Sequence, residues 1–357
     1  MIPEMKFKKV LVDKDNKCEA CSVFDVYNRG QKDIVCGEYI YFAPDYSDKT
    51  KQKICSIQYD GNYVHDFSDF PFDVNEDGYK DIITGSWWSE GLYWRENSKD
   101  AHTEWKTHKI ETISSIETIR YFDIDGDGEI EIFPNTPGEP QCFFKLTGNG
   151  KFTKFVIGTN NSGHGMGFGD VNGDGKTDIL LSNGWLEQPD DLYGGKWIMH
   201  EEYNIPMACV PILCYDVNND GLNDIIIGNG HGYGLWWLEQ KIINGSRNFI
   251  THVIDDVCSQ YHDMQLFDID NDGELELITG ARYFAHNGND PGEHNPIGVY
   301  IFKINGGEFK KYTLDYGTPD EHSGLGIYFW LADLNNNGKT DIIAPGKEGL
   351  YIFYNNL

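Results

Sequence analysis

Short apolar stretches separated by polar turns recur along the chain, and they follow the same order in each repeat. An apolar segment runs into an Asp-rich turn, and a run of branched residues such as Ile179–Leu181 or Ile225–Ile227 follows the turn. An aromatic segment such as Leu235–Leu238 and an alternating segment such as Phe249–Ile254 complete the unit. Short runs of branched and aromatic residues predict strands, and no segment has the 3.6-residue period of a capped helix. We therefore predict an all-β protein with four short strands in each repeat.

The turn between the first and second predicted strands places oxygen-bearing side chains at a fixed spacing. In Asp170–Asp178 they stand at positions 1, 3, 5 and 9, with a glycine at position 6. Ca²⁺ takes six to eight oxygen ligands, which this loop supplies together with the carbonyl of position 7. An EF-hand starts in the same way but needs a Glu at position 12 and a helix on each side. Because a strand follows here, the pattern predicts a calcium-binding turn between two β-strands.

The same turn recurs at intervals of 46 to 65 residues along the whole chain. Its copies begin at Asp25, Asp73, Asp123, Asp170, Asp216, Asp268 and Asp333. Periods of this length with four strands in each unit are typical of propeller blades. We therefore predict one domain, residues 1–357, folded as a seven-bladed β-propeller of four-stranded blades.

The two ends of the chain are predicted to meet in one blade. Lys6–Val12 has the alternation of side chains that is typical of a strand, and Leu350–Tyr354 is predicted to be a third strand with no fourth strand after it. The N-terminal strand can complete the last blade, which would close the ring and remove two sheet edges.

Six of the seven turns keep the ligand pattern, and we expect them to hold structural Ca²⁺. The predicted ligands are Asp73, Asn75, Asp77, Asp81, Asp123, Asp125, Asp127, Glu131, Asp170, Asn172, Asp174, Asp178, Asp216, Asn218, Asp220, Asp224, Asp268, Asp270, Asp272, Glu276, Asp333, Asn335, Asn337 and Asp341. The alternative is an Asp- and Gly-rich hairpin without metal, and at Asp333, which has two carboxylates, the two interpretations are equally supported. In the seventh turn Arg29 replaces the position-5 acid and would repel a cation.

Charge and cysteine content limit the partners and leave the compartment open. The formal net charge of −28 argues against nucleic acid or an anionic membrane as a partner, and no apolar run could span a bilayer. The first residues show no signal peptide, which predicts a cytoplasmic protein. The calcium turns instead favour an extracellular or periplasmic one from which a leader was removed. The eight cysteines lack a disulfide-scaffold spacing and are expected to be small buried side chains. The oligomeric state is not predicted.

The loops that lead into the first strands carry metal-ligating side chains at one register. His164 and His262 stand six positions before the first Asp of their turns, and Glu117 and Glu19 take the equivalent place. In a closed ring, equivalent starts of the inner strands point to one central mouth. We therefore predict that His164, His262 and Glu117 hold Zn²⁺ or another divalent cation there, opposite the calcium turns. Loop histidines that bond to backbone are the alternative.

Further candidate residues fall in loops on the same predicted face, where functional loops of repeat proteins gather. The candidate catalytic residues are His231, Arg282, Tyr283 and His322. The candidate substrate-binding residues are Trp87, Trp88, Trp185, Glu187, Glu38, Tyr39 and Lys347. The longest insertion, Arg282–Pro296, also holds His286 and Asp290.

The repeated turns resemble FG-GAP or VCBS repeats, the calcium-loop blades that integrin α-subunits also contain, and the resemblance covers nearly the whole chain. It implies the propeller and its calcium ligands but no particular chemistry, because propellers host many functions. The segment His164–Pro189 is most similar to the propeller part of aldos-2-ulose dehydratase-like proteins, which eliminate water from keto sugars. Propeller polysaccharide lyases such as ulvan lyases are a looser likeness. The catalytic residues of these families do not align with this chain.

These features favour a lyase or dehydratase that acts on a keto or uronic sugar or oligosaccharide. Such an elimination needs a base for the proton beside the carbonyl and a cation or Arg for the charge that develops. The alternative is a non-catalytic, calcium-dependent carbohydrate-binding or adhesion propeller, which would repeat a shallow site in each blade. A purely structural interaction module is a third possibility and would leave the His and Arg residues unexplained.

Overall fold

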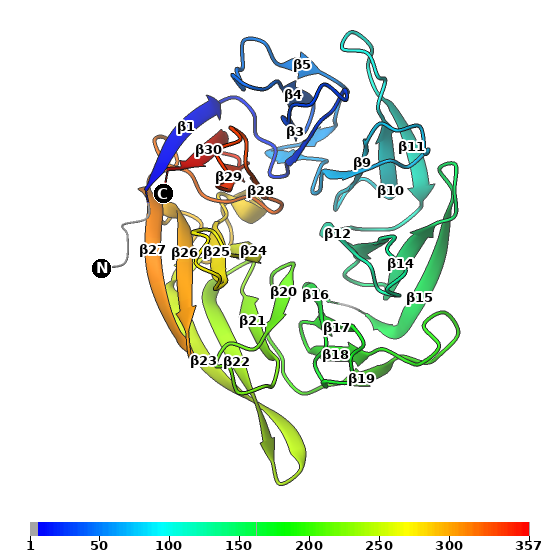
Figure 1. Ribbon diagram of the computed structural model, residues 1–357, viewed down its shortest axis with the longest axis vertical. Coiled ribbons are helices and arrows are strands. Elements are labelled where there is room, and N and C mark those ends of the chain that lie inside the picture. The colour runs from blue at the N-terminus through cyan, green and yellow to red at the C-terminus, as the bar shows by residue number, and fades with distance from the viewer. Residues whose placement is uncertain (1–5, 162, 357) are drawn as a thin grey trace.

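The sheets of this protein stand around a central axis in a propeller-like ring (Figure 1). The structure, a computed structural model, describes residues 6–161 and 163–356 and consists of strands joined by turns. The only helical element in these two ranges is one 3-10 turn, η1 (Ala285–Asn287). The predicted all-β class and ring arrangement are confirmed. Nowhere in the described ranges does a helix form that could span a bilayer.

Five separate four-stranded antiparallel sheets make up most of the ring, and four of them are meanders of consecutive strands. Their strands are β2 (Ser22–Phe24), β3 (Asp33–Cys36), β4 (Tyr39–Tyr41) and β5 (Gln52–Lys53); β8 (Phe70–Phe72), β9 (Asp81–Gly85), β10 (Leu92–Glu96) and β11 (Lys106–Glu111); β12 (Thr118–Phe122), β13 (Glu131–Asn135), β14 (Pro140–Leu146) and β15 (Phe152–Asn161); β24 (Tyr261–Phe267), β25 (Glu276–Ala281), β26 (Ile297–Asn305) and β27 (Glu308–Gly317); and β28 (Trp330–Ala332), β29 (Asp341–Ala344) and β30 (Leu350–Asn355) with β1 (Phe7–Asp13).

The other large sheet has eight strands and corrects the predicted blade count. Its strands are β16 (Met166–Gly169), β17 (Asp178–Leu181), β18 (Gly184–Glu187), β19 (Ile198–His200), β20 (Ile212–Tyr215), β21 (Asp224–Gly228), β22 (Tyr233–Ile243) and β23 (Ser246–Ser259). The inner strands β16 and β20 pair in parallel, with Gly167 opposite Ile212. A Cβ on Gly167 would lie 1.8 Å from the Ile212 carbonyl oxygen, so only glycine allows this approach. The prediction of seven separate blades is wrong, because five separate blades and this joined sheet form the ring.

The N-terminal strand closes the ring as predicted. β1 pairs antiparallel with β30, from Phe7 opposite Asn355 to Asp13 opposite Leu350. Figure 1 shows the blue first strand beside the red last one. The strand that the sequence placed at Lys6–Val12 is therefore found within one residue, and it covers the edge that β30 would otherwise expose.

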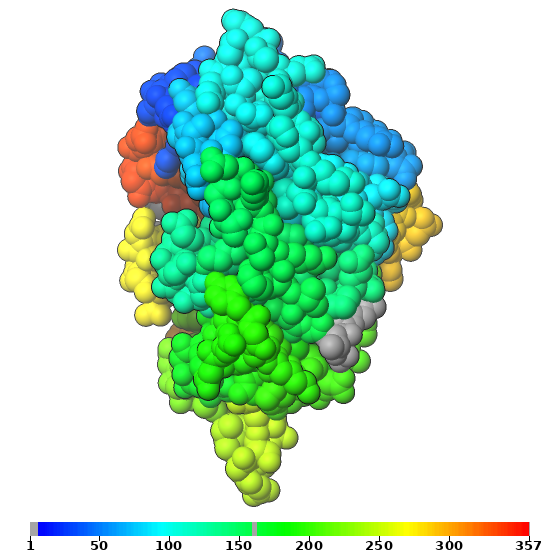
Figure 2. Space-filling view, turned by 90° about the vertical axis from the view of Figure 1, so that its right-hand side faces the viewer, coloured from blue at the N-terminus to red at the C-terminus, as the bar shows by residue number. Residues whose placement is uncertain are grey.

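Apolar side chains fill the spaces between neighbouring sheets. Ile83 of β9, for example, packs in one buried cluster with Ile119 of β12 and Phe144 of β14. The eight cysteines are free, and six of them are buried in such layers, as expected. Two additions depart from the blade pattern. A small hairpin of β6 (Tyr59–Asp60) and β7 (Tyr63–Val64) precedes β8, and the β22–β23 hairpin extends well beyond the ring (Figures 1 and 2).

Candidate metal centre

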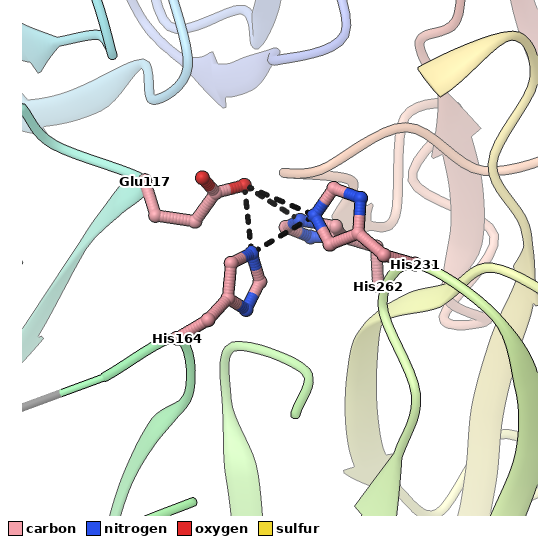
Figure 3. A group of neighbouring side chains, drawn as sticks. All are labelled: Glu117, His164, His231 and His262. Atoms are coloured by element: carbon pink, nitrogen blue, oxygen red, sulfur yellow. Dashed lines mark hydrogen bonds and ion pairs between the residues drawn. The ribbon is translucent and has the colours of Figure 1, made fainter. Parts of the chain in front are cut away.

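Four side chains from four separate segments meet where the inner strands begin (Figure 3). Glu117 directly precedes β12, His164 lies just before β16, His262 is in β24, and His231 stands in the loop between β21 and β22. All four are buried, and one ligand atom from each lies within 4.8 Å of those of the others. The structure thus brings together Glu117, His164 and His262, the three residues that share a register in the sequence. It adds His231, which the sequence placed beside a substrate.

The facing atoms of this cluster are close enough to share one cation. The Nε2 atom of His262 lies 2.8 Å from Glu117 Oε1, and the Nε2 atom of His164 lies 3.2 Å from the same oxygen. The Nε2 atoms of His164 and His231 are 3.0 Å apart, and His231 Nε2 is 4.0 Å from Glu117 Oε1. Three imidazole nitrogens and one carboxylate oxygen therefore surround a common point.

The outer nitrogens of two imidazoles are held by acceptors. His164 Nδ1 donates to the carbonyl oxygen of Ala208 at 2.6 Å, and His231 Nδ1 donates to Asp290 Oδ2 at 2.7 Å. The other oxygen of Asp290 accepts from His286 Nδ1 at 2.8 Å, and the rings of His231 and His286 stack at 4.3 Å. Metal-binding histidines are usually oriented by such bonds to a carbonyl or a carboxylate.

Burial is the main influence on the protonation of the cluster. It lowers the pKa of His262 to about 3 and that of His231 to about 4, although Glu117 and Asp290 favour the protonated forms. Burial alone would raise the pKa of Glu117, but His164 and His262 outweigh it and hold this pKa well below its usual range. At neutral pH the cluster thus presents a carboxylate and unprotonated imidazoles at positions 231 and 262, the forms that bind metals.

A cavity of about 140 Å³ lies beside the cluster. Its lining residues are Tyr63, Phe67, Trp87, Trp88, Glu117, His231, Arg282 and His286. Trp87 and Trp88 are 37% and 36% exposed, and the Trp88 ring lies 4.7 Å from that of Tyr63. Aromatic walls with a few polar groups on one side are suited to a sugar ring. Five candidate residues of the sequence therefore share this cavity: Trp87, Trp88, Glu117, His231 and Arg282.

Arg282 follows β25 and is held by a buried ion pair. Its Nε donates to Glu19 Oε1 at 2.7 Å, and the Lys347 ammonium lies 3.3 Å from the other oxygen of Glu19. Burial alone would raise the pKa of Glu19, but the two cations lower it to about 2. Burial lowers the pKa of Lys347 to about 8. Glu19 has the register of Glu117, yet it binds these cations instead of joining the histidine cluster.

Trp185 and Glu187 belong to a motif inside the blades and not to the cavity. Trp185 is fully buried, its ring stacks on that of His200 at 4.1 Å, and Glu187 pairs with His200 at 2.7 Å. The same stacking and pairing recur in the sets Trp94, His108 and Glu96, and Trp237, His252 and Glu239. The predicted sugar-stacking role of Trp185 conflicts with this burial, since no face of its ring is open to a ligand.

The other candidate residues also lie outside the lining of this cavity. His322 pairs with Asp315 at 2.7 Å beside the last blade. Glu38 accepts a backbone hydrogen bond and pairs with a lysine, and a second lysine covers the ring of Tyr39. Tyr283 is half-buried. Loop positions in the sequence do not determine how far a side chain reaches, so these candidates stay predictions.

Two groups near the cluster were not identified as site residues from the sequence. Tyr63 and Phe67 line the cavity from the segment around β7, which lies outside the repeat and carries no recognisable signal. His286 and Asp290 come from the long insertion between β25 and β26. The unusual length of that insertion was the one signal that could have pointed to them.

The six turns with the calcium pattern fold around their own carboxylates. In the turn that begins at Asp170, this residue accepts the N–H groups of Asp174 and Gly175, while Asp178 accepts that of Val171. The first and last carboxylates of the other five turns accept equivalent bonds. These bonds gather the oxygens on one side of each loop, and calcium binding by the turns stays a prediction.

Basic side chains pair with carboxylates of most turns: Lys99 lies 2.7 Å from Asp77 and Lys241 lies 3.2 Å from Asp220, and in two other turns one lysine contacts three carboxylates. Lys145 Nζ lies 2.5 Å from Asp125, 2.7 Å from Asp127 and 3.0 Å from Glu131. Lys303 occupies the same place among Asp270, Asp272 and Glu276. In the seventh turn the Arg29 guanidinium pairs with Asp33 at 2.6 Å. Lys145 and Lys303 neutralise carboxylates that the sequence assigned to Ca²⁺ alone.

A second, larger cavity of about 590 Å³ is lined by the inner strands themselves. Its walls are mostly apolar and include Phe122, Phe168 and Trp330. Arg120 and Asp263 also line it and form an ion pair of 2.7 Å that links β12 to β24 across the ring. No member of the histidine cluster lines this cavity, so the candidate site is the cluster with the smaller cavity beside it.

The comparisons with known proteins agree with this description. A family model for the FG-GAP-like repeat matches residues 73–133 and 216–279, and each segment contains two of the Asp-rich turns. The structure and this match together define a propeller-like protein with FG-GAP-like repeats. No curated protein matches the sequence.

Solved structures share the fold at low sequence identity. The rhamnogalacturonan lyase YesW is 11% identical, with 99% of this chain and 74% of that chain covered at a TM-score of 0.50. BBS1N, solved in complex with ARL6DN, is 9% identical, with 98% and 96% covered at a TM-score of 0.56. At these identities the likeness shows the fold and not the activity.

Proposed function

We propose that this protein is a carbohydrate-active lyase or dehydratase that acts on a keto or uronic sugar by metal-assisted proton abstraction and elimination. The observation that carries the proposal is the cluster of Glu117, His164 and His262 beside a cavity with aromatic walls and a buried arginine. Elimination next to a carbonyl needs a base and a positive charge that stabilises the developing oxyanion. The cavity has both kinds of group within one small volume.

The donor set of the cluster fits a divalent cation. Two imidazoles and a carboxylate are ligands that Zn²⁺ and similar ions accept, with positions left for substrate oxygens. When bound, such an ion would polarise the sugar oxygen next to the reacting carbon. Gly230 packs closely against two of the imidazoles, because a Cβ there would lie 3.1 Å from the His262 ring and 3.4 Å from that of His164.

Side chains of the cavity supply the remaining roles. His286 Nδ1 is bound to Asp290, so its Nε2 carries the lone pair of a general base. Arg282 brings a permanent positive charge to the cavity wall, where it would bind a substrate carboxylate or enolate oxygen. Trp87 and Trp88 would stack on the sugar ring.

A binding function without catalysis is the second candidate, and the exposed Trp87 and Trp88 favour it. Partly exposed indoles beside a cavity are suited to carbohydrate recognition whether or not a reaction follows. A binding propeller would bind the sugar without converting it, and this lack of turnover separates the two candidates.

The proposed structural cofactor is Ca²⁺ in the Asp-rich turns. The first and ninth carboxylates, which accept backbone N–H groups of their own loops, support it in the turns at Asp73, Asp170 and Asp216. In the first and last of these turns the ion would compete with one lysine that pairs with the fifth carboxylate. The turns at Asp123 and Asp268 would bind it in competition with Lys145 and Lys303, and Asp333 remains the turn with the fewest carboxylates.

The experiment is a screen of uronate-containing polysaccharides and keto sugars, read by the ultraviolet absorbance of the conjugated elimination product. The native protein loaded with Zn²⁺ should show turnover that His164→Ala and His286→Ala reduce at least a hundredfold, a typical loss on removal of a general base or a charge-stabilising group. His102→Ala, in an exposed turn, is the matched control. Sugar binding without turnover in every sample would replace the lyase proposal by the binding function.

A further inference from the structure

We propose that His231 is a fourth ligand of the mouth cation and that Asp290, from the long insertion, is the positioning residue that holds it there. The inference rests on the cation of the proposed function, and with four protein ligands that cation would bind a substrate oxygen at a fifth position. The inference goes beyond that function because the sequence register points only to Glu117, His164 and His262, and His231 stands outside that register in the loop between β21 and β22.

The argument starts from the position of the imidazole hydrogens. A carbonyl oxygen only accepts, so His164 Nδ1 carries the hydrogen of its 2.6 Å bond to Ala208. Asp290 is an acceptor as well, so His231 Nδ1 carries the hydrogen of its 2.7 Å bond. In the neutral rings both Nε2 atoms are then bare lone pairs.

These two lone pairs face each other at 3.0 Å. Glu117 Oε1, another acceptor, lies 3.2 Å from His164 Nε2 and 4.0 Å from His231 Nε2. The two imidazole lone pairs therefore meet in a buried place without a hydrogen between them, next to a carboxylate oxygen that also contacts His262 Nε2 at 2.8 Å, and a buried acceptor left unpaired is costly. One cation at their common point would satisfy all three donors together, whereas a single proton could join only two.

The groups around His231 fix it in this orientation. Its backbone N–H donates to Asn229 Oδ1 at 3.0 Å, and its ring stacks on His286 at 4.3 Å. Asp290 accepts from both imidazoles through separate oxygens. His231 thus has an N–H held by a carboxylate and a free nitrogen aimed at the cluster, which is the usual arrangement of a metal-bound histidine.

The same geometry removes His231 from the role of base. One of its nitrogens is bound to Asp290 and the other faces His164 and Glu117, so neither is directed at a ligand in the cavity. His286 keeps its Nε2 available and shares Asp290 as its partner. A single carboxylate of the insertion therefore orients one metal ligand and one base.

The test uses the full-length protein stripped of metal and then supplied with excess Ca²⁺, so that the Asp-rich turns are occupied by their preferred ion. Zn²⁺ affinity is measured by competition with a chromophoric chelator, and Co²⁺ is used for its visible absorption spectrum, which reports coordination. The variants are His231→Ala and Asp290→Asn, with His102→Ala as the control. His231→Ala should weaken Zn²⁺ binding by at least about a hundredfold and change the Co²⁺ spectrum. Asp290→Asn should weaken it by about ten- to a hundredfold, the usual effect of losing a partner of a ligating histidine.

The outcomes separate this inference from the proposed function. Wild-type Zn²⁺ affinity and an unchanged Co²⁺ spectrum in His231→Ala would overturn the assignment, even if the protein proves to be a lyase. If that variant does not fold, the same two results in Asp290→Asn would overturn the role of Asp290 and with it the inference. Absence of Zn²⁺ and Co²⁺ binding by the native protein would overturn it as well. The expected losses together with no reaction on any sugar would support the four-ligand site and reject the lyase.

Discussion

His164 and His231 face each other through Nε2 atoms 3.0 Å apart, while their Nδ1 atoms donate to acceptors on opposite sides. In the metal-free protein both rings should therefore be Nδ1–H tautomers. Histidines of the blade motif provide internal controls, because His200 and His252 bind Glu187 and Glu239 through Nε2 and should be Nε2–H tautomers. Nitrogen NMR of the histidine-labelled protein distinguishes the two forms. An Nε2–H signal for either His164 or His231 would contradict the hydrogen placement on which the fourth ligand depends.

The lysines in two turns should limit calcium binding there. Lys145 lies among Asp125, Asp127 and Glu131, and these carboxylates raise its pKa against the effect of burial, so the ammonium stays charged. Lys145→Met should raise the Ca²⁺ affinity of this turn by roughly tenfold, which corresponds to about 1.4 kcal/mol. Calorimetric titration measures the change. Lys176→Met is the control, since its ammonium lies 3.9 Å from the nearest turn carboxylate and pairs with exposed Asp190. Equal affinities in both variants and the native protein would contradict competition.

Calcium should also stabilise the ring, because it binds the folded turns and not the unfolded chain. Each occupied site at a hundredfold excess over Kd adds about 2.7 kcal/mol to the free energy of unfolding. Excess chelator should therefore lower the melting temperature by several degrees, and added Ca²⁺ should restore it. Scanning calorimetry with metal analysis of the same sample tests this, and an unchanged melt after verified loss of Ca²⁺ would leave the turns as metal-free hairpins.

Glu19 should make the free energy of unfolding depend on pH. Its folded pKa of about 2 lies below the ordinary value of 4.5, so its contribution is complete above about pH 4.5 and is lost as the pH falls towards 2. The difference between these two pKa values corresponds to about 3 kcal/mol in the free energy of unfolding. Glu19→Gln should lower stability at pH 7 by about 3 to 5 kcal/mol, because Arg282 and Lys347 lose their buried partner.

The difference between native protein and Glu19→Gln should shrink as the pH is lowered through that window. Urea unfolding at a series of pH values measures it, and Glu321→Gln, at an exposed side chain, should show no such trend. A difference that stays constant from pH 7 to pH 3 would mean that the Glu19 ion pair does not govern this part of the acid response.

The sequence predicted what depends on the repeat and missed what depends on contacts between loops. Equivalent positions in equivalent turns brought Glu117, His164 and His262 together, because inner strands of a ring start around one axis. His231 and Asp290 meet through two loops of unrelated length, and no period encodes that approach. The predicted calcium turns all join a first to a second strand of a repeat, as expected, because they too occupy equivalent positions in the repeats.

Two other departures have local physical causes. The absent side chain of Gly167 lets β16 pair with β20, so two expected blades became one sheet. Trp185 was predicted to bind a substrate because the sequence placed it in a loop, whereas it lies in strand β18 with its ring buried. Its equivalence to Trp94 and Trp237, each followed two residues later by a Glu, was visible in the sequence and identifies the blade motif.

Trp87 and Trp185 should therefore respond in opposite ways to truncation. Trp87→Ala should weaken binding of the sugar found by the activity screen by about tenfold or more, because it lines the cavity and is 37% exposed, and should leave the melting temperature nearly unchanged. Trp185→Ala should lower the free energy of unfolding by about 3 to 5 kcal/mol, the cost of a large core truncation. Titration of the sugar and urea unfolding measure the two effects. If Trp185→Ala weakens sugar binding about tenfold and leaves the free energy of unfolding nearly unchanged, Trp185 is a binding residue.

Loss of β1 should open the ring at its closing sheet. β1 supplies the outer strand beside β30, and Lys9 adds an ion pair of 2.6 Å to Asp315 in the neighbouring sheet. A chain that begins at Lys14 would expose the row of backbone donors and acceptors on β30, which invites edge-to-edge pairing. It should melt at lower temperature and aggregate, whereas a chain that begins at Lys6 keeps β1 and serves as the control.

A synthetic peptide of residues 6–13, added to the shortened chain, should restore the melting temperature in part, because an isolated strand can add to an exposed sheet edge. Light scattering and thermal melts of the three samples test the closure directly. A shortened chain that remains monomeric with the melting temperature of the control would show that the ring is held by the contacts between its sheets, such as the apolar layer around Ile301, Tyr351 and Phe353, and not by its N-terminal strand.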